Sequence, residues 1–202
     1  MGLRGKPLTS VGGRSAIRTT WQQPPFARDC RSHLMKPRPF LRPSALLALL
    51  WLAFAGYVWW SSAHLPQRVA IHFGVNGVPN NWQTPGQYLC FMLIFGTVVP
   101  AFVLGNFAFI RRMNGWGLNI PHKDYWLAPE RREETFDYVQ SRGFWLAGLL
   151  LALLTIVNWA IVAANAHAPV ALRPTFFLGV GAFLVAMLVW AITFTRHFRK
   201  TA

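Results

Sequence analysis

Residues 66–82 read PQRVAIHFGVNGVPNNW and lie between two long apolar runs. The segment 69–73 (VAIHF) alternates in the period-two pattern of a β-strand. Asn76-Gly77 follows, and this pair is the strongest short hairpin signal because both residue types tolerate the positive φ of a tight turn. Pro79 begins a second extended piece and restricts it to a sheet edge or a strand end. The stretch therefore predicts a small β-hairpin at a membrane surface.

The chain contains four long apolar runs, and the predicted hairpin lies between the first two. They cover Ser44–Ala63, Tyr88–Ile110, Phe144–Ala166 and Pro174–Thr195, and none of them contains Asp, Glu, Lys or Arg. A span needs roughly 20 apolar residues to cross a hydrocarbon core of about 30 Å. The composition also indicates a membrane protein, because 53% of the residues are hydrophobic and only 13% are charged. We predict an all-α integral membrane protein with four transmembrane helices and a short outward β-hairpin.

The basic residues predict how the chain is oriented. Twenty Lys and Arg oppose six Asp and Glu, for a net charge of +14. Such a balance can indicate nucleic-acid binding, but here the charge is interrupted by runs of membrane-spanning length, so we expect no nucleic-acid partner. The successive segments outside the runs hold nine, one, six, one and three Lys or Arg. The positive-inside rule then places both termini of this expected inner-membrane protein in the cytoplasm and the loop 64–87 outward.

Residues 1–43 form a basic segment rich in Pro, Gly and Ser that cannot bury a core, and we expect it to be disordered. It could bind anionic lipid headgroups, act as an Arg-rich targeting segment, or result from a start codon placed too early, with Met35 as the alternative start. Cys30 lies in this segment and Cys90 in an apolar run. We expect neither a disulfide nor a metal site from them.

The connection 111–143 is the longest polar one and is predicted to be a cytoplasmic loop with an amphipathic helix. The helix is expected to begin at Ala128-Pro129, because proline suits the first helical position and the glutamates that follow suit the helix N-terminus. It could lie on the membrane surface or continue into the third span, with Gly143 as a hinge. The run 130–134 (ERREE) is interpreted as a solvated helix face with weak local ion pairs rather than a partner contact. Residues 144–202 supply two further spans and a basic tail.

Small and polar residues inside the spans are expected to hold the helices together. Asn106 and Asn158 could form hydrogen bonds between helices, and Gly179 and Gly181 could allow close helix approach. A transport path would more often contain ionisable residues at depth, and the runs have none. This argues against a proton- or ion-coupled transporter.

The candidate binding residues all lie on the predicted hairpin. Here His72, together with His64 and His167, could form a metal or proton-sensing cluster. However, the two outward loops contain no carboxylate, so we predict that His72 forms a hydrogen bond within the hairpin. The candidate residues are Pro66, His72, Phe73, Asn76, Gly77, Pro79, Asn80 and Trp82. Among them Pro66, Phe73 and Trp82 could line a pocket for a peptide or lipid, or form the hairpin's own core.

The pattern Leu65-Pro66, VAIHF at 69–73, Asn76-Gly77, Pro79-Asn80 and Trp82 resembles that of a bacterial membrane family catalogued as domain of unknown function 1648. The resemblance covers about residues 45–110. The same module occurs at the N-terminus of SdpI-type immunity proteins, which protect bacilli from a secreted killing peptide. The resemblance implies two spans joined by an outward loop. The second half of the chain shows no match to those immunity proteins.

Recognition is the function that these observations favour. The hairpin would bind a peptide, a lipid or a membrane protein, and immunity or signalling would be the outcome. The four spans would contact the lipid bilayer. A homo-oligomer is left open. The alternative is a small permease or an accessory subunit of a transport complex. The His-Glu-x-x-His pattern, the Gly-x-Ser-x-Gly elbow and the phosphate-binding glycine loop are absent. We therefore predict no enzyme activity, no catalytic residue, no metal and no cofactor.

Overall fold

The computed structural model describes residues 41–199, so the predictions for the basic N-terminal segment, Met35 and Cys30 lie outside the described part of the chain. The elements are α2 (Leu41–Ser62), β1 (Val69–Phe73), β2 (Pro79–Gln83), α3 (Pro85–Arg112), α4 (Lys123–Trp126), α5 (Arg132–Asn165) and α6 (Thr175–Arg199). Four of these helices are long and apolar enough to cross a membrane. The predicted fold class is therefore confirmed.

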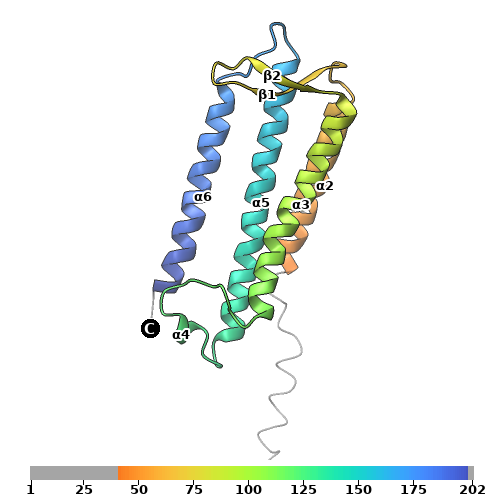
Figure 1. Ribbon diagram of the computed structural model, residues 1–202. Coiled ribbons are helices and arrows are strands. Elements are labelled where there is room, and N and C mark those ends of the chain that lie inside the picture. Colours follow the sequence, from red (N-terminus) through yellow and green to blue (C-terminus); the bar gives the residue numbers. More distant parts are fainter. Residues whose placement is uncertain (1–40, 200–202) are drawn as a thin grey trace, which may run out of the picture. The chain divides into compact units, whose positions relative to one another are not determined.

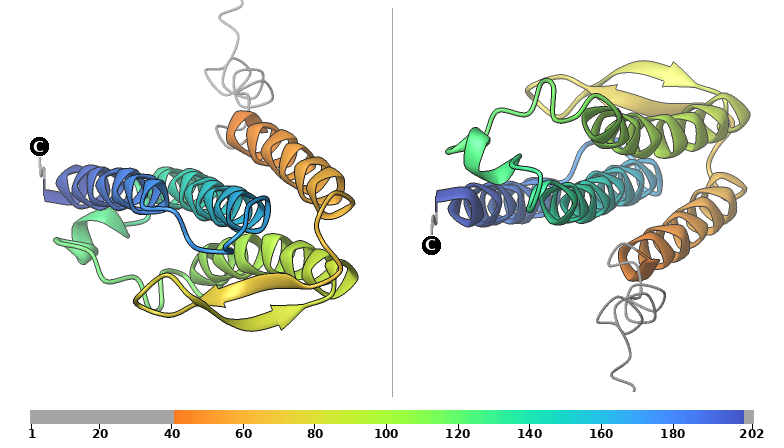
Figure 2. Two further views of the ribbon diagram at one scale, coloured as in Figure 1. Left: turned by 90° about the horizontal axis from the view of Figure 1, so that it is seen from above. Right: turned by 90° about the horizontal axis from the view of Figure 1, so that it is seen from below.

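The four long helices run side by side, with the hairpin at one end and α4 at the other (Figure 1). We call these the hairpin end and the α4 end. Helix α5 packs against α2, α3 and α6, whereas α6 packs mainly against α5. Both views in Figure 2 accordingly place α5 between α6 and α2. The start of α2 and the end of α6 both lie at the α4 end, as an even number of crossings requires.

Helix α3 begins directly after the hairpin. The hydroxyl of Thr84 accepts a hydrogen bond from the backbone N–H of Gln87 at 3.3 Å, and the side-chain oxygen of Gln87 accepts one from the backbone N–H of Thr84 at 3.0 Å. This capping box, with Pro85 at the first helical position, stabilises the helix start. The span therefore begins at Pro85, before the predicted Tyr88, and only Thr84 separates it from β2.

Helix α5 differs from the expectation in two ways. It begins at Arg132, because the backbone N–H groups of Arg131 and Arg132 both bond the carbonyl of Ala128 and close a turn before the helix. The predicted start at Ala128-Pro129 is therefore wrong. The helix then continues without a break to Asn165, so the amphipathic segment and the third span form one element. Gly143 is no hinge: it is buried in mid-helix, where a Cβ would approach the Phe107 ring to 2.7 Å.

The charged run 130–134 also forms an ion pair with another helix, which was not predicted. The Arg111 guanidinium at the end of α3 lies 2.7 Å from the Glu133 carboxylate and 2.6 Å from that of Asp137. Only the Arg132–Glu133 pair, at 3.9 Å, is local. The interpretation of residues 130–134 as a face with only local ion pairs is therefore wrong, because Glu133 links two helices. The sequence reasoning did not single out Asp137.

The polar residues within the spans have different roles. Asn158 is fully buried, accepts a hydrogen bond from the Tyr88 hydroxyl at 2.7 Å and donates one to the Ser61 hydroxyl at 3.2 Å. It thus joins α5 to α3 and α2, as predicted. Asn106 donates only to the carbonyl of Phe102 in its own helix at 2.8 Å, so its predicted role between helices is wrong.

The two glycines that were predicted to allow close helix approach also have different roles. A Cβ on Gly179 would lie 2.7 Å from Cγ2 of Ile156, which confirms close packing of α6 on α5 there. Gly181 has no neighbouring atom within 4 Å, so the same prediction is wrong for it. The closest approach involves Gly96 of α3, which the sequence analysis did not single out. The ring of Phe54 from α2 occupies the space that a side chain at Gly96 would need.

Candidate recognition site at the hairpin

Strands β1 and β2 pair antiparallel, with Ala70 opposite Trp82 and Phe73 opposite Pro79. The turn between them closes through a hydrogen bond from the Gly77 N–H to the Gly74 carbonyl at 2.9 Å. Gly77 has φ of +75°, a conformation that glycine adopts without steric cost. The side-chain oxygen of Asn76 accepts from the N–H of Val78 at 3.2 Å. The predicted hairpin is therefore present, but its turn spans Gly74 to Gly77, and of the Asn76-Gly77 pair only Gly77 has a positive φ.

The side chain of Asn165, the last residue of α5, holds the hairpin on the bundle. Its Oδ1 accepts a hydrogen bond from the Ala70 N–H at 2.8 Å, and its Nδ2 donates to the Ala70 carbonyl at 2.9 Å. The amide thus bonds both backbone groups of one residue, as a neighbouring strand would. Val69 and Ala70 are fully buried, and Val69 belongs to the same core cluster as Tyr88. The base of β1 is therefore attached to the helices by both polar and apolar contacts.

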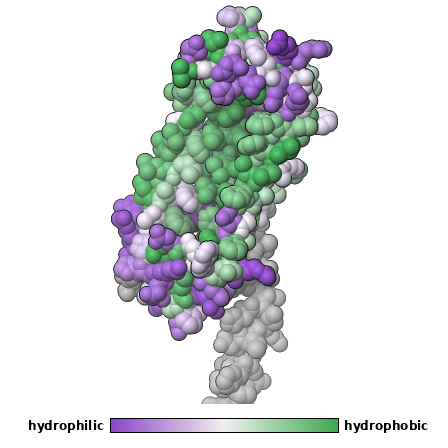
Figure 3. Space-filling view, in the orientation of Figure 1, coloured by the Kyte–Doolittle hydropathy of each residue, from purple (hydrophilic) through white to green (hydrophobic). Residues whose placement is uncertain are grey.

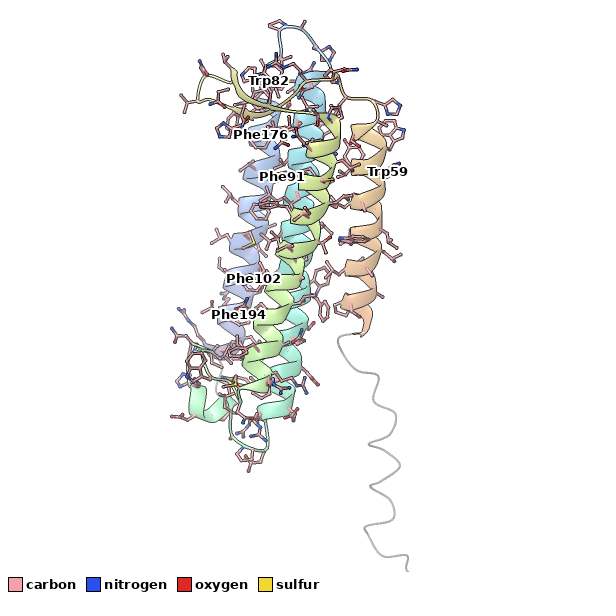
Figure 4. The ribbon with its side chains drawn as sticks, turned by 45° about the vertical axis from the view of Figure 1, so that its right-hand side comes forward. Trp59, Trp82, Phe91, Phe102, Phe176 and Phe194 are labelled. Atoms are coloured by element: carbon pink, nitrogen blue, oxygen red, sulfur yellow. The ribbon has the colours of Figure 1, made fainter. Side chains whose placement is uncertain are left out.

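The connection between α5 and α6 supports the hairpin turn. The Leu172 N–H donates to the Gly77 carbonyl at 3.1 Å. Beside this contact lies a groove of about 450 Å³, which we call the hairpin groove. It is lined by Phe73, Gly74, Val75, Asn76, Gly77, Leu172, Pro174, Phe176 and Phe177. Figure 4 shows Phe176 at the top of α6, beneath the strand that carries Trp82. The groove therefore combines residues that are about 100 positions apart in the sequence.

The histidines do not come together as a metal cluster would require. Nδ1 of His72 lies 2.6 Å from Oδ1 of Asn80, which confirms the predicted hydrogen bond within the hairpin. Nδ1 of His64 donates instead to the carbonyl of Trp60 at 2.7 Å. Between residues 41 and 199 no group of three or more His, Cys, Asp or Glu could hold a metal ion.

The other candidate residues are divided between different surfaces. Phe73 lines the hairpin groove, whereas Trp82 lies 37% exposed on β2, with the guanidinium of Arg68 5.5 Å from its ring centre. Pro66 is exposed in the loop before β1. The buried contacts of the hairpin come from Val69 and Ala70, which the sequence analysis did not place in the site. Asn80 and Asn81 are exposed on β2, while Asn76 and Gly77 form the groove edge.

Sequence reasoning missed the part of the site that comes from the second half of the chain. Asn165, Leu172, Phe176 and Phe177 all lie outside the stretch 66–82. The one available signal was Asn165 itself, a polar residue near the end of an apolar run. Its partner Ala70 could not be identified without the fold.

The surface of the bundle separates polar from apolar regions (Figure 3). On the face that is shown, hydrophilic residues gather at both ends and hydrophobic residues cover the middle. Of the described basic side chains outside α2, only Arg68 and Arg173 belong to the hairpin end. The others belong to the α4 end: Arg111, Arg112, Lys123, Arg131, Arg132, Arg142, Arg196 and Arg199. The apolar middle is the surface that contacts a lipid bilayer.

Four apolar helices that carry a hairpin at one end define a multi-pass membrane protein. Residues 46–97 match the model of a family described as "Domain of unknown function (DUF1648)". The predicted resemblance to domain of unknown function 1648 is therefore confirmed. The match covers most of α2, the hairpin and the first half of α3, but not α5 or α6. Searches of curated proteins and of solved structures gave no match.

Proposed function

We propose that this protein is a membrane recognition protein whose hairpin groove binds an apolar segment of a peptide. The observation that carries the proposal is the groove itself, which the hairpin turn and the α5–α6 connection build jointly. Its volume of about 450 Å³ falls in the range of ligand pockets, roughly 300–1,000 Å³. The aromatic rings of Phe73, Phe176 and Phe177 provide apolar walls, and Phe177 is 64% exposed. Exposed apolar surface beside polar loops is typical of a binding site.

A peptide suits this site better than a lipid chain because the hairpin that lines the groove also has a sheet edge to which an extended backbone can add. The sheet has only two strands, so β2 has a strand partner on one side alone. The side chains at Asn80, Asn81 and Trp82 on that strand are exposed. An extended peptide could add to this edge and insert its side chains into the groove, as in β-strand addition. Immunity-like protection and signalling are two outcomes of such binding.

Recognition ranks above the alternative of a small permease because the buried polar side chains of Tyr88, Asn158 and Ser61 have structural partners. The Tyr88 hydroxyl, the Asn158 amide and the Ser61 hydroxyl bond one another rather than line a path. A permease would instead need intramembrane residues that interact with a substrate during transport. We continue to propose that the protein is not an enzyme.

The lining of the hairpin groove predicts which exposed aromatic side chain contributes to peptide binding. Phe177 and Phe102 are 64% and 71% exposed, but only Phe177 lines the groove. A displayed library of short linear peptides, selected on the protein in lipid nanodiscs, should yield sequences rich in apolar residues. A fluorescent peptide from that selection should bind Phe177→Ser about tenfold or more weakly than the parent, because an aromatic anchor is lost. Binding to the matched control Phe102→Ser should stay unchanged. Equal binding by both variants, or the absence of any selected peptide, would contradict the proposal.

The orientation of the hairpin end is a separate prediction. The positive-inside rule places it outside the inner membrane, since the α4 end carries most of the basic residues. After Cys30 and Cys90 are replaced by serine, Asn81→Cys should react with a membrane-impermeant thiol reagent in intact cells with permeabilised outer membranes. Trp116→Cys, at an exposed position in the connection between α3 and α4, should react only after lysis. The reverse pattern would place the hairpin in the cytoplasm and move the search for a ligand there.

A further inference from the structure

A second hollow lies between α5 and α6 at the α4 end, far from the hairpin groove along both helices. It has a volume of about 530 Å³ and is lined by Tyr138, Arg142, Thr193, Arg196 and His197. We call it the α5–α6 basic pocket. Two of the five lining residues are arginines and none is acidic. The proposed recognition function makes no use of it.

Aromatic packing holds the walls of this pocket in place. The Tyr138 ring stacks on His197 with a centroid distance of 3.7 Å and an angle of 12°. The Arg142 guanidinium lies 4.9 Å from the centre of the same tyrosine ring, a cation–π geometry. The indole N–H of Trp190 donates to the backbone carbonyl of Arg142 at 3.1 Å, which ties α6 to α5 just beyond the pocket. Trp190 stacks in turn on Phe194, which Figure 4 shows near this end of α6.

Three side chains of the pocket, those of Arg142, Arg196 and Tyr138, can bind an anion. The ion pairs among the described residues involve Arg111 and Arg132. Arg142 and Arg196 therefore have no acidic partner in the described part of the chain. The Tyr138 hydroxyl is buried and has no hydrogen-bond partner. Two guanidinium groups and a free hydroxyl donor form a set that suits phosphate, because arginine can bind phosphate oxygens in a bidentate manner.

The pocket lies at the depth of a lipid headgroup. Arg142 is two residues before Phe144, where the third apolar run begins. Helix α5 has 34 residues, hence a length of roughly 51 Å at 1.5 Å per residue, and so extends beyond a hydrocarbon core of about 30 Å. From the pocket toward the hairpin end of α6, Ile192, Val189 and Leu188 are 44%, 54% and 59% exposed. An apolar surface for acyl chains therefore begins next to the basic pocket.

We propose that the α5–α6 basic pocket binds the phosphate of an anionic phospholipid, with the acyl chains along the exposed face of α6. Basic pockets between transmembrane helices on the cytoplasmic side are a common form of site for anionic lipid headgroups. A free phosphate ion is also an anion, but it has no acyl chain that could contact the apolar surface beside the pocket. The lipid would fill the space beside α6, which packs mainly against α5.

The test measures the stabilisation of the purified protein, in detergent micelles, by added phosphatidylglycerol, by phosphatidylcholine and by inorganic phosphate. Titration of thermal unfolding gives an apparent affinity for each. Phosphatidylglycerol should bind at least about tenfold more tightly than phosphatidylcholine, and inorganic phosphate at millimolar concentration should neither stabilise nor compete. The double variant Arg142→Gln/Arg196→Gln should lose about tenfold or more in affinity for phosphatidylglycerol, because two charge-assisted contacts are removed.

The matched control is Arg112→Gln/Lys123→Gln, which removes the same charge from the same end of the bundle without touching the pocket. It should keep the parent affinity. If it loses as much affinity as the pocket variant, binding depends on general charge and the proposed site is overturned. Equal affinity for both lipids, or competition by free phosphate, overturns the lipid assignment. Should the glutamine variant fail to fold, Arg142→Lys/Arg196→Lys keeps both charges but loses the bidentate geometry, and an affinity equal to the parent's would also count against the site.

Discussion

Replacing Asn165 with leucine is expected to release the hairpin from the bundle. The amide of Asn165 is bonded to both backbone groups of Ala70, at 2.8 and 2.9 Å, and its Nδ2 also donates to the Ile161 carbonyl at 2.9 Å. Leucine fills nearly the same volume but offers neither donor nor acceptor. The buried Ala70 N–H and carbonyl would then lose their partners. We expect a loss of about 2–4 kcal/mol in the free energy of unfolding, since each unsatisfied buried polar group costs about 1–3 kcal/mol.

Two measurements separate the local effect from the global one. Thermal unfolding in detergent reports the stability, and hydrogen exchange of residues 69–83, followed by mass spectrometry in nanodiscs, reports the opening of the hairpin. Exchange there should become much faster in Asn165→Leu, while exchange in the middle of α3 and α5 should change little. The matched control is Asn106→Leu, because Asn106 is bonded only to its own helix. If hairpin exchange in Asn165→Leu equals that of the parent, then burial of Val69 alone holds the strand.

Gly96→Ala is the substitution for which we expect the second large effect. A Cβ at this position would overlap the ring of Phe54, which is itself 2% exposed in the contact between α2 and α3. A buried aromatic ring cannot move aside without displacing its neighbours, so either the ring or the helix must shift. Overpacking of this kind costs about 1–3 kcal/mol. Thermal unfolding of the variant in detergent should show that loss.

Gly105, in the same helix, provides the control because no atom lies within 4 Å of a Cβ built there. Gly105→Ala should be neutral or slightly stabilising, since alanine favours helix over glycine. The contact is tested further by combining Gly96→Ala with Phe54→Leu. The smaller side chain should relieve the overlap, so the double variant should be more stable than the sum of the two single effects predicts. Strict additivity would mean that Phe54 does not limit the approach of α2 to α3.

Both substitutions affect parts of the protein on which the proposed recognition site depends. Gly96 lies within the matched family segment 46–97, and it sets how closely α2 and α3 pack beneath the hairpin. Asn165 lies outside that segment, yet it positions β1. In this chain the family module and the second pair of helices therefore build the proposed recognition site together.

The sequence by itself determined the membrane class, the number of spans and the hairpin. Runs such as Tyr88–Ile110 specify helices because a bilayer leaves backbone groups no partner outside their own segment. Asn76-Gly77 specifies the turn because Gly77 can adopt the positive φ that closes it. That His72 forms a hydrogen bond within the hairpin was also predicted, but its partner Asn80 was not, because the register places Asn81 opposite His72. All of these features depend on neighbours along the chain.

The tertiary structure alone decided which distant residues meet. The sequence could not distinguish Asn158, which joins three helices, from Asn106, which bonds its own, because both are asparagines in apolar runs. Nor could it show that α5 continues through Gly143, since a helix in water and a helix in a membrane share one backbone geometry. The pairing of Asn165 with Ala70 spans 95 residues. Such pairings depend on how the helices pack, and packing follows from side-chain shape and hydrogen bonding in three dimensions rather than from periodicity along the chain.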